Sequence, residues 1–159
     1  MKFKPKKVYL SVGSNLGDRA AHLEEARSRV ERLPETKFLR ASSVLETDPV
    51  GGPPQGKYLN AIWEIETALS PKELKDGLKK IEETLGRKPS FRNAPREIDL
   101  DIILYGDQVV EENDLQIPHP RFHERGFVLE PLAELVPGKI HPTLGKTVRE
   151  LLEELESRR

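Results

Sequence analysis

Two aspartates stand two residues apart in an otherwise apolar segment, Ile98-Asp99-Leu100-Asp101-Ile102-Ile103-Leu104. Side chains alternate between the faces of a strand, so Asp99 and Asp101 would emerge on one face, about 7 Å apart. Two carboxylates at this spacing repel each other and favour a shared cation. A divalent ion such as Mg²⁺, with substrate phosphates completing its coordination, suits them at least as well as Lys or Arg side chains. The spacing alone leaves open that both are solvent-facing residues of an edge strand.

A basic segment precedes the acidic pair. Residues 86–96 read Gly-Arg-Lys-Pro-Ser-Phe-Arg-Asn-Ala-Pro-Arg and contain four cationic side chains. Guanidinium groups bind phosphate oxygens while carboxylates hold magnesium, so this charge order suits a metal–polyphosphate substrate. For Arg87 and Lys88 considered alone, a solvated loop is the commoner interpretation.

Composition narrows the class of protein. The 159 residues suit one domain of ordinary size, and we expect residues 1–159 to form a single domain. The sequence has no cysteine, which excludes disulfide scaffolds, thiolate metal sites and cysteine nucleophiles. The 26 Lys and Arg residues nearly balance the 27 Asp and Glu residues, so no overall charge attracts nucleic acid or an acidic membrane. No apolar segment has signal-peptide or membrane-spanning length, and we expect a cytoplasmic protein.

Strand and helix patterns alternate along most of the chain. Residues 7–12, 37–46, 61–69 and 98–105 have the composition of strands, and 19–33 and 71–85 have apolar residues at helical spacing. Gly106-Asp107 predicts a turn that pairs the last strand with 108–110 in a hairpin. This order predicts an α+β fold, a ferredoxin-like βαββαβ sandwich with both helices on one face of the sheet. Residues 128–136 and 148–155 predict C-terminal helical additions whose location the pattern does not give.

Four separated segments resemble one enzyme family. Arg92-Asn93-Ala94-Pro95-Arg96-Glu97-Ile98-Asp99-Leu100-Asp101-Ile102-Ile103 is similar to the signature of 6-hydroxymethyl-7,8-dihydropterin pyrophosphokinase. Three further segments resemble that family in the same order: Val12-Gly13-Ser14-Asn15-Leu16-Gly17, Tyr58-Leu59-Asn60-Ala61, and Ile117-Pro118-His119-Pro120 with Arg125-Gly126-Phe127. Some members have Trp-Gly where this chain has Asn93-Ala94, and an aromatic residue where it has Pro120. We assign those positions no role.

The resemblance implies the reaction and its cofactor. The family transfers diphosphate from ATP to the pterin alcohol in folate biosynthesis, by in-line attack of the hydroxymethyl oxygen on the β-phosphorus with AMP as the leaving group. Two Mg²⁺ ions would lie between the ATP phosphates and the carboxylates of Asp99 and Asp101. The expected partners are therefore the two small-molecule substrates, with no nucleic acid and no membrane, and the expected oligomeric state is a monomer.

The resemblance also implies a pterin site. Tyr58 and Phe127 would stack on the two faces of the pterin, and the carboxamide of Asn60 would read its amide edge. From residue type alone, the two aromatic residues could equally be core residues, and Asn60 could close the preceding loop. The implied pterin-binding residues are Thr47, Val50, Tyr58, Asn60, Asp99 and Phe127.

An ATP site is implied in the same way. Its residues would be Glu82, Arg87, Arg92, Arg96, Ile98, His119 and Arg125. Of these, Arg87, Arg96, His119 and Arg125 would be catalytic, because they supply fixed positive charge or hydrogen bonds around the transferred phosphates. Taken alone, His119 is more simply a loop histidine and Glu82 a solvated helix glutamate.

Two rival functions follow from the same features. Ferredoxin-like sheets often bind RNA, but the predicted strands lack the clustered aromatic residues that stack on bases. A metal-dependent phosphatase or nuclease would use the same acidic pair, and the release of AMP without the pterin would distinguish it.

Overall fold

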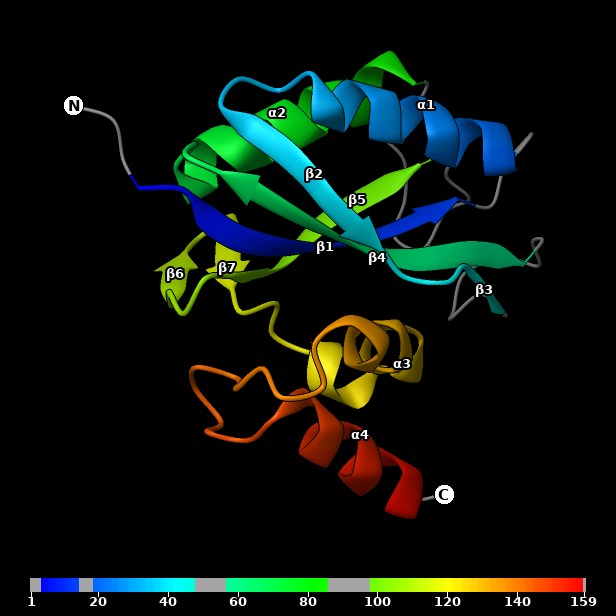
Figure 1. Ribbon diagram of the computed structural model, residues 1–159, viewed down its shortest axis with the longest axis vertical. Helices are drawn as coiled ribbons and strands as arrows, with labels where there is room; N and C mark the ends of the chain where they lie inside the picture. Colours follow the sequence, from blue (N-terminus) through cyan, green and yellow to red (C-terminus); the bar gives the residue numbers. More distant parts are fainter. Residues whose placement is uncertain (1–3, 15–18, 48–56, 86–97, 159) are drawn as a thin grey trace.

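The main sheet is antiparallel and contains five strands. The computed structural model describes residues 4–14, 19–47, 57–85 and 98–158. Four strands lie in the order β2-β4-β1-β5, and β3 pairs with β4 beyond the end of β2 (Figure 1). Their bounds are β1 (Lys6–Ser14), β2 (Thr36–Ala41), β3 (Leu45–Thr47), β4 (Tyr58–Thr67) and β5 (Asp99–Tyr105).

Helices α1 (Arg19–Glu31) and α2 (Pro71–Thr84) cover one face of this sheet (Figure 1). Helix α2 begins at a capping box: the Ser70 hydroxyl accepts the N–H of Glu73, and the Glu73 carboxylate accepts the N–H of Ser70. Both bonds satisfy N–H groups that the first turn would otherwise leave without partners. The two helices predicted from the sequence are confirmed.

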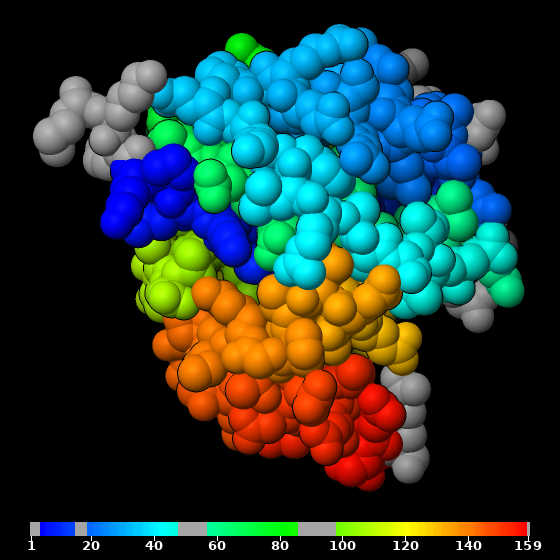
Figure 2. All heavy atoms as spheres, in the orientation of Figure 1, coloured from blue at the N-terminus to red at the C-terminus, as the bar shows by residue number. Residues whose placement is uncertain are grey.

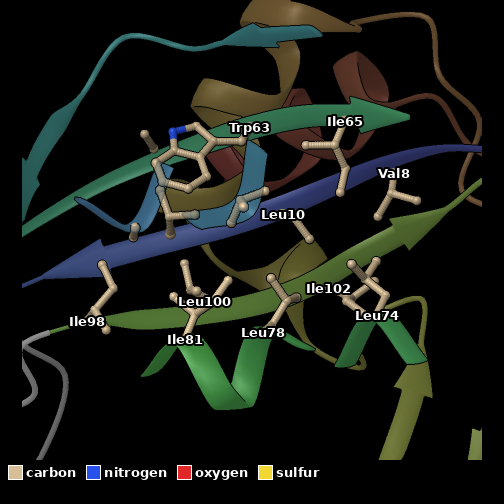
Figure 3. Packing of buried hydrophobic residues seen from close by; sticks show 14 of the residues in the cluster. Val8, Leu10, Trp63, Ile65, Leu74, Leu78, Ile81, Ile98, Leu100 and Ile102 are labelled. Atoms are coloured by element: carbon tan, nitrogen blue, oxygen red, sulfur yellow. The ribbon is translucent and has the colours of Figure 1, made fainter. Parts of the chain in front are cut away.

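The first core lies between these helices and the sheet. Figure 3 shows Leu74, Leu78 and Ile81 of α2 pointing toward Leu100 and Ile102 of β5. All five side chains are buried. Burial of each such side chain contributes about 1.5–3 kcal/mol, so this contact fixes β5 against α2.

A second core lies on the opposite face of the sheet. Helices α3 (Gly126–Leu135) and α4 (Val148–Ser157) confirm the two predicted C-terminal helices, and α4 begins at a second capping box, on Thr147. Figure 2 shows the segment coloured orange to red, which includes α3 and α4, as a separate layer against the strands. The second core contains Tyr9, Ile62, Ile103, Leu104, Phe122, Val128, Leu129, Leu132, Val148 and Leu151.

The prediction of one continuous strand over residues 37–46 is wrong. The structure has β2 and β3 there, separated by residues 42–44. Ser42 is the cause, because its hydroxyl, rather than a backbone carbonyl, accepts the N–H of Ile62. The next residue, Ser43, donates both its N–H and its hydroxyl to Glu134 of α3.

The prediction that β5 forms a hairpin with the segment after it is also wrong. Gly106 makes the expected turn with a φ of 53°, but the following strand β6 (Val110–Glu112) pairs with β7 (Leu115–Ile117) instead of with β5. The side chain of Asp107 contacts Lys139, which draws this turn toward the C-terminal layer. None of the helices that the structure describes is both long and apolar enough to cross a membrane.

Candidate functional site

Asp99 and Asp101 share one face of β5. Leu100, between them, points into the first core, so both aspartates face the opposite side, as their spacing predicts. Asp99 is half-buried and Asp101 is exposed. Their strand lies at the edge of the sheet, with Gly13 opposite Asp99 and Ser11 opposite Asp101 on β1.

Two predicted pterin residues lie on the same face of the neighbouring strands. Tyr58 and Asn60 alternate with Ala61 and point to the side of the sheet that holds the second core. Gly13 of β1 pairs with Asn60 on one side and with Asp99 on the other. Adjacent strands are about 4.8 Å apart, so the backbones of Asn60 and Asp99 lie about 10 Å from each other. A flat bicyclic ring fits this span.

Gly13 gives the site its close packing. A Cβ atom at this position would lie 3.1 Å from Oδ1 of Asn60 and 3.6 Å from the ring of Tyr58. The hydrogen atom of glycine therefore lets the amide of Asn60 lie against β1, whereas the ring of Tyr58 is at an ordinary van der Waals distance. Sequence reasoning assigned no role to this residue, although a glycine inside a strand often marks a close approach.

Thr47 joins this group through β3. The Nδ2 atom of Asn60 donates to Oγ1 of Thr47 over 2.5 Å, and Thr47 pairs with Tyr58 in the ladder. The bond fixes which way the carboxamide of Asn60 points, because Nδ2 is directed at Thr47 and Oδ1 at Gly13. Three predicted pterin residues, Thr47, Tyr58 and Asn60, are thus brought together.

His119 and Arg125 come from the segment between β7 and α3, and Phe127 lies in the first turn of α3. The backbone N–H of His119 donates to the carbonyl of Ile103 over 3.0 Å, which holds this segment beside β5. Arg125 precedes the first turn of α3, and its guanidinium carbon lies 5.9 Å from the ring centroid of Phe127. Arg125 is exposed, whereas Phe127 is half-buried and packs partly against the second core.

The electrostatics connect His119 to the acidic pair. Burial of the ring lowers the pKa of His119 first, the charge of Arg125 lowers it further, and the charge of Asp99 opposes both. His119 is therefore mainly neutral near pH 7, and can donate one hydrogen bond from its ring. Its Nδ1 atom is buried, with no hydrogen-bond partner in the described part of the chain.

Glu82 and Ile98 occupy buried positions near the start of β5. Glu82, on α2, is 4% exposed, and its Oε2 accepts the backbone N–H of Leu100 over 2.7 Å. The alternative of a solvated helix glutamate is therefore wrong. The side chain of Ile98 is fully buried in the first core, so only its backbone could contact ATP.

Four predicted site residues, Val50, Arg87, Arg92 and Arg96, lie outside the described residues. Within residues 4–14, 19–47, 57–85 and 98–158, no three His, Cys, Asp or Glu side chains come close enough together to hold a metal ion. A metal at Asp99 and Asp101 would therefore take most of its ligands from elsewhere, which is usual for Mg²⁺ bound with a nucleotide.

Comparison with known proteins gives a consistent result. The family model for 7,8-dihydro-6-hydroxymethylpterin-pyrophosphokinase (HPPK) matches residues 9–137. The 2-amino-4-hydroxy-6-hydroxymethyldihydropteridine pyrophosphokinase of Aquifex aeolicus is 41% identical over 143 residues, which are 90% of this chain and 88% of the relative. The protein of the same name from Bacillus subtilis is 43% identical over 128 residues, 80% of this chain and 77% of the relative.

Solved structures agree at the level of the fold. A crystal structure of wild-type Plasmodium falciparum HPPK-DHPS with pteroate superposes with a TM-score of 0.79 at 16% sequence identity. The match covers 99% of this chain and 44% of the longer one. The family model covers most of the chain, including Asp99, Asp101, Tyr58 and Asn60. The chain therefore belongs to the 7,8-dihydro-6-hydroxymethylpterin-pyrophosphokinase family.

Proposed function

We propose that this chain transfers diphosphate from ATP to 6-hydroxymethyl-7,8-dihydropterin, producing AMP and the pterin diphosphate in folate biosynthesis. Family membership and the names of the relatives support this reaction. The observation that carries it is the common face of the sheet, where Asp99 and Asp101 lie beside Tyr58 and Asn60. The two aspartates suit a metal-bound phosphate chain, and Tyr58 with Asn60 suits a flat heterocycle.

The pterin lies over β4 and β1 in this proposal. Tyr58 and Phe127 stack on its two faces, and Asn60, oriented by Thr47, hydrogen-bonds its amide edge. Val50 is the remaining pterin-binding residue of this proposal. Asp99 lies between the proposed pterin and phosphate sites, so the hydroxymethyl group would point from the ring toward the acidic pair.

The donor set of the acidic pair fits Mg²⁺. Two carboxylates on one face, one exposed and one half-buried, leave room for water and phosphate oxygens. Two bound Mg²⁺ ions would neutralise the charge of the triphosphate and align it for attack. Asp99 and Asp101 would hold these ions from one face of β5.

The remaining residues stabilise charge during transfer. The pterin hydroxymethyl oxygen forms a bond to the β-phosphorus and releases its proton to solvent. The bond from that phosphorus to the AMP oxygen breaks, and negative charge moves to AMP. The cation of Arg125 and a ring N–H of neutral His119 lie on the side of the acidic pair and bind oxygens on which this charge develops. Arg87, Arg92 and Arg96 supply further positive charge from the basic segment. Ile98 would contribute its backbone to the ATP site, and the buried Glu82 would act on that site through β5.

The antiparallel order β2-β4-β1-β5, with α1 and α2 on one face, supports a ferredoxin-like class for this fold. We further propose one domain over residues 1–159, a monomer and a cytoplasmic location.

The test is an assay that measures AMP and pterin diphosphate together. We expect AMP to appear only when ATP, Mg²⁺ and the pterin are all present, in equal amounts with pterin diphosphate. Release of AMP at the same rate without the pterin would contradict the proposal and favour a phosphatase or nuclease.

A further inference from the structure

Glu82 contacts the strand that carries both aspartates, but through the residue between them. Its Oε2 accepts the backbone N–H of Leu100 over 2.7 Å, and the Glu82 side chain is almost completely buried. We propose that Glu82 is a positioning residue that fixes the backbone of β5 so that Asp99 and Asp101 hold the metal together. This inference rests on the proposed metal-binding role of the two aspartates.

The position of β5 explains why such a bond is needed. The strand lies at the edge of the main sheet, with β1 on one side. Backbone N–H groups of alternate residues point to opposite sides of a strand. Since that of Leu100 is directed at Glu82, those of Asp99 and Asp101 point toward β1. The acidic pair is therefore held from both sides, by β1 and by α2.

Packing alone does not require a carboxylate at this position. Glu82 follows Ile81 on the buried side of α2, where Leu74 and Leu78 are the other buried residues. An apolar side chain would fill the space without the cost of burying a charged group. The acceptor oxygen is what an apolar residue lacks, and a carboxylate accepts an N–H more strongly than a neutral group does.

The consequence for the site is geometric. Without the bond, Leu100 remains packed in the first core through its side chain, but its backbone is free to shift on the outer side of β5. The two carboxylates, one residue away on each side, shift with it. Displacements of about 1 Å are enough to weaken catalysis strongly, because reacting groups must be aligned closely.

Three substitutions separate this role from direct contact with ATP. Glu82→Gln keeps an acceptor oxygen and removes the charge, whereas Glu82→Met keeps the length and removes the acceptor. Glu82→Asp keeps the charge but shortens the reach, and replaces the Met variant if that variant does not fold. Glu83→Ala, at an exposed neighbouring position on α2, is the matched control.

The first measurement is amide hydrogen exchange by NMR, read at Leu100. Loss of the bond in Glu82→Met should raise exchange at Leu100 about tenfold, whereas exchange at Leu10 of the central strand should not change. The Gln variant and the control should stay near wild type. Unchanged exchange at Leu100 in the Met variant would overturn the inference.

The second measurement is Mg²⁺ affinity, by calorimetry in the presence of a non-hydrolysable ATP analogue. We expect Glu82→Met to weaken Mg²⁺ binding about tenfold and Glu82→Gln by less than about threefold. Equal loss in both variants would overturn the inference, since it would make the charge essential, as in direct contact with a cation or ATP. Amide exchange at Leu100 can be measured even if the chain transfers no diphosphate. A failure of the proposed function is thus distinguished from a failure of this inference.

Discussion

The side chain of Asn60 on β4 donates a hydrogen bond to that of Thr47 on β3, with 2.5 Å between Nδ2 and Oγ1. In Thr47→Val the shape is kept but the acceptor is lost, so the carboxamide of Asn60 is no longer held. We expect pterin affinity to fall about tenfold while ATP affinity stays unchanged, measured by calorimetry with a non-hydrolysable ATP analogue. Thr47→Ser keeps the hydroxyl and should bind the pterin nearly as well as wild type. Equal binding by the Val and Ser variants would contradict this role.

Replacement of either aspartate by asparagine should abolish most of the activity. Asp99→Asn and Asp101→Asn each remove one charge that would hold Mg²⁺, and we expect the rate of diphosphate transfer to fall at least about 100-fold. Asp114→Asn is the control, because the Asp114 side chain is 83% exposed and forms an ion pair with Lys75 on α2. All three variants should keep the wild-type melting temperature within a few degrees. Activity within about tenfold of wild type in both site variants would refute the metal site.

Gly13→Ala should affect one substrate and spare the other. The added methyl group would push the amide of Asn60 away from β1, because its carbon would lie 3.1 Å from Oδ1, and would contact the ring of Tyr58 at an ordinary 3.6 Å. We expect the KM for the pterin to rise about tenfold and the KM for ATP to stay within about twofold. Circular dichroism checks that the sheet is retained. A parallel rise in both KM values would mean that the substitution disturbs β1 as a whole.

Tyr9→Phe tests a buried polar contact away from the substrates. The hydroxyl of Tyr9 donates to Glu64 over 2.6 Å, while Arg40 binds both oxygens of the same carboxylate. Hydrogen bonds to charged groups contribute about 1.5–3 kcal/mol, and we expect a loss in the free energy of unfolding near the lower end, because Arg40 remains. Urea denaturation measures it. Unchanged stability would show that Arg40 alone satisfies Glu64.

Stability should fall on acidification through His141. Burial, and then the charge of His123, lower its pKa from the ordinary value of 6.5. Its Nδ1 also accepts the N–H groups of Thr143 and Leu144. The unfolded chain thus binds the proton more tightly, so the free energy of unfolding decreases as the pH falls below about 6.5 and levels off below the folded pKa.

The control for this pH effect is His141→Asn, whose carboxamide oxygen can accept the same two N–H groups. Urea denaturation between about pH 7.5 and pH 5 should show a shallower decline for this variant than for wild type. The lowered pKa of His119 acts in the same direction and remains in both proteins. Identical slopes would show that His141 does not contribute.

Local sequence patterns predicted the structural features that depend only on residues close together in the chain. The capping box of Ser70 and Glu73 defines the start of α2, and alternation along β5 places Asp99 and Asp101 on one face. Both follow from the geometry of single elements. The likeness to the family added the residues of the pterin and ATP sites, which no single element would have provided.

The missed features all depend on contacts between distant segments. Glu82 looks like a surface residue until the backbone of Leu100 is placed beside it. The break between β2 and β3 depends on the bond of Ser42 to Ile62, and the location of α3 on the second face depends on the complete sheet. Periodicity reports that a helix has an apolar side, but not which surface covers it.

The two cores on opposite faces divide the site between them. Asn60 and Asp99 belong to strands that α1 and α2 cover on one face, whereas Arg125 and Phe127 lie at the start of α3, which packs through the second core. Detachment of α3 and α4 would leave a sheet still backed by α1 and α2 but would separate the two halves of the site. Opening of either core alone would therefore be enough to take the site apart.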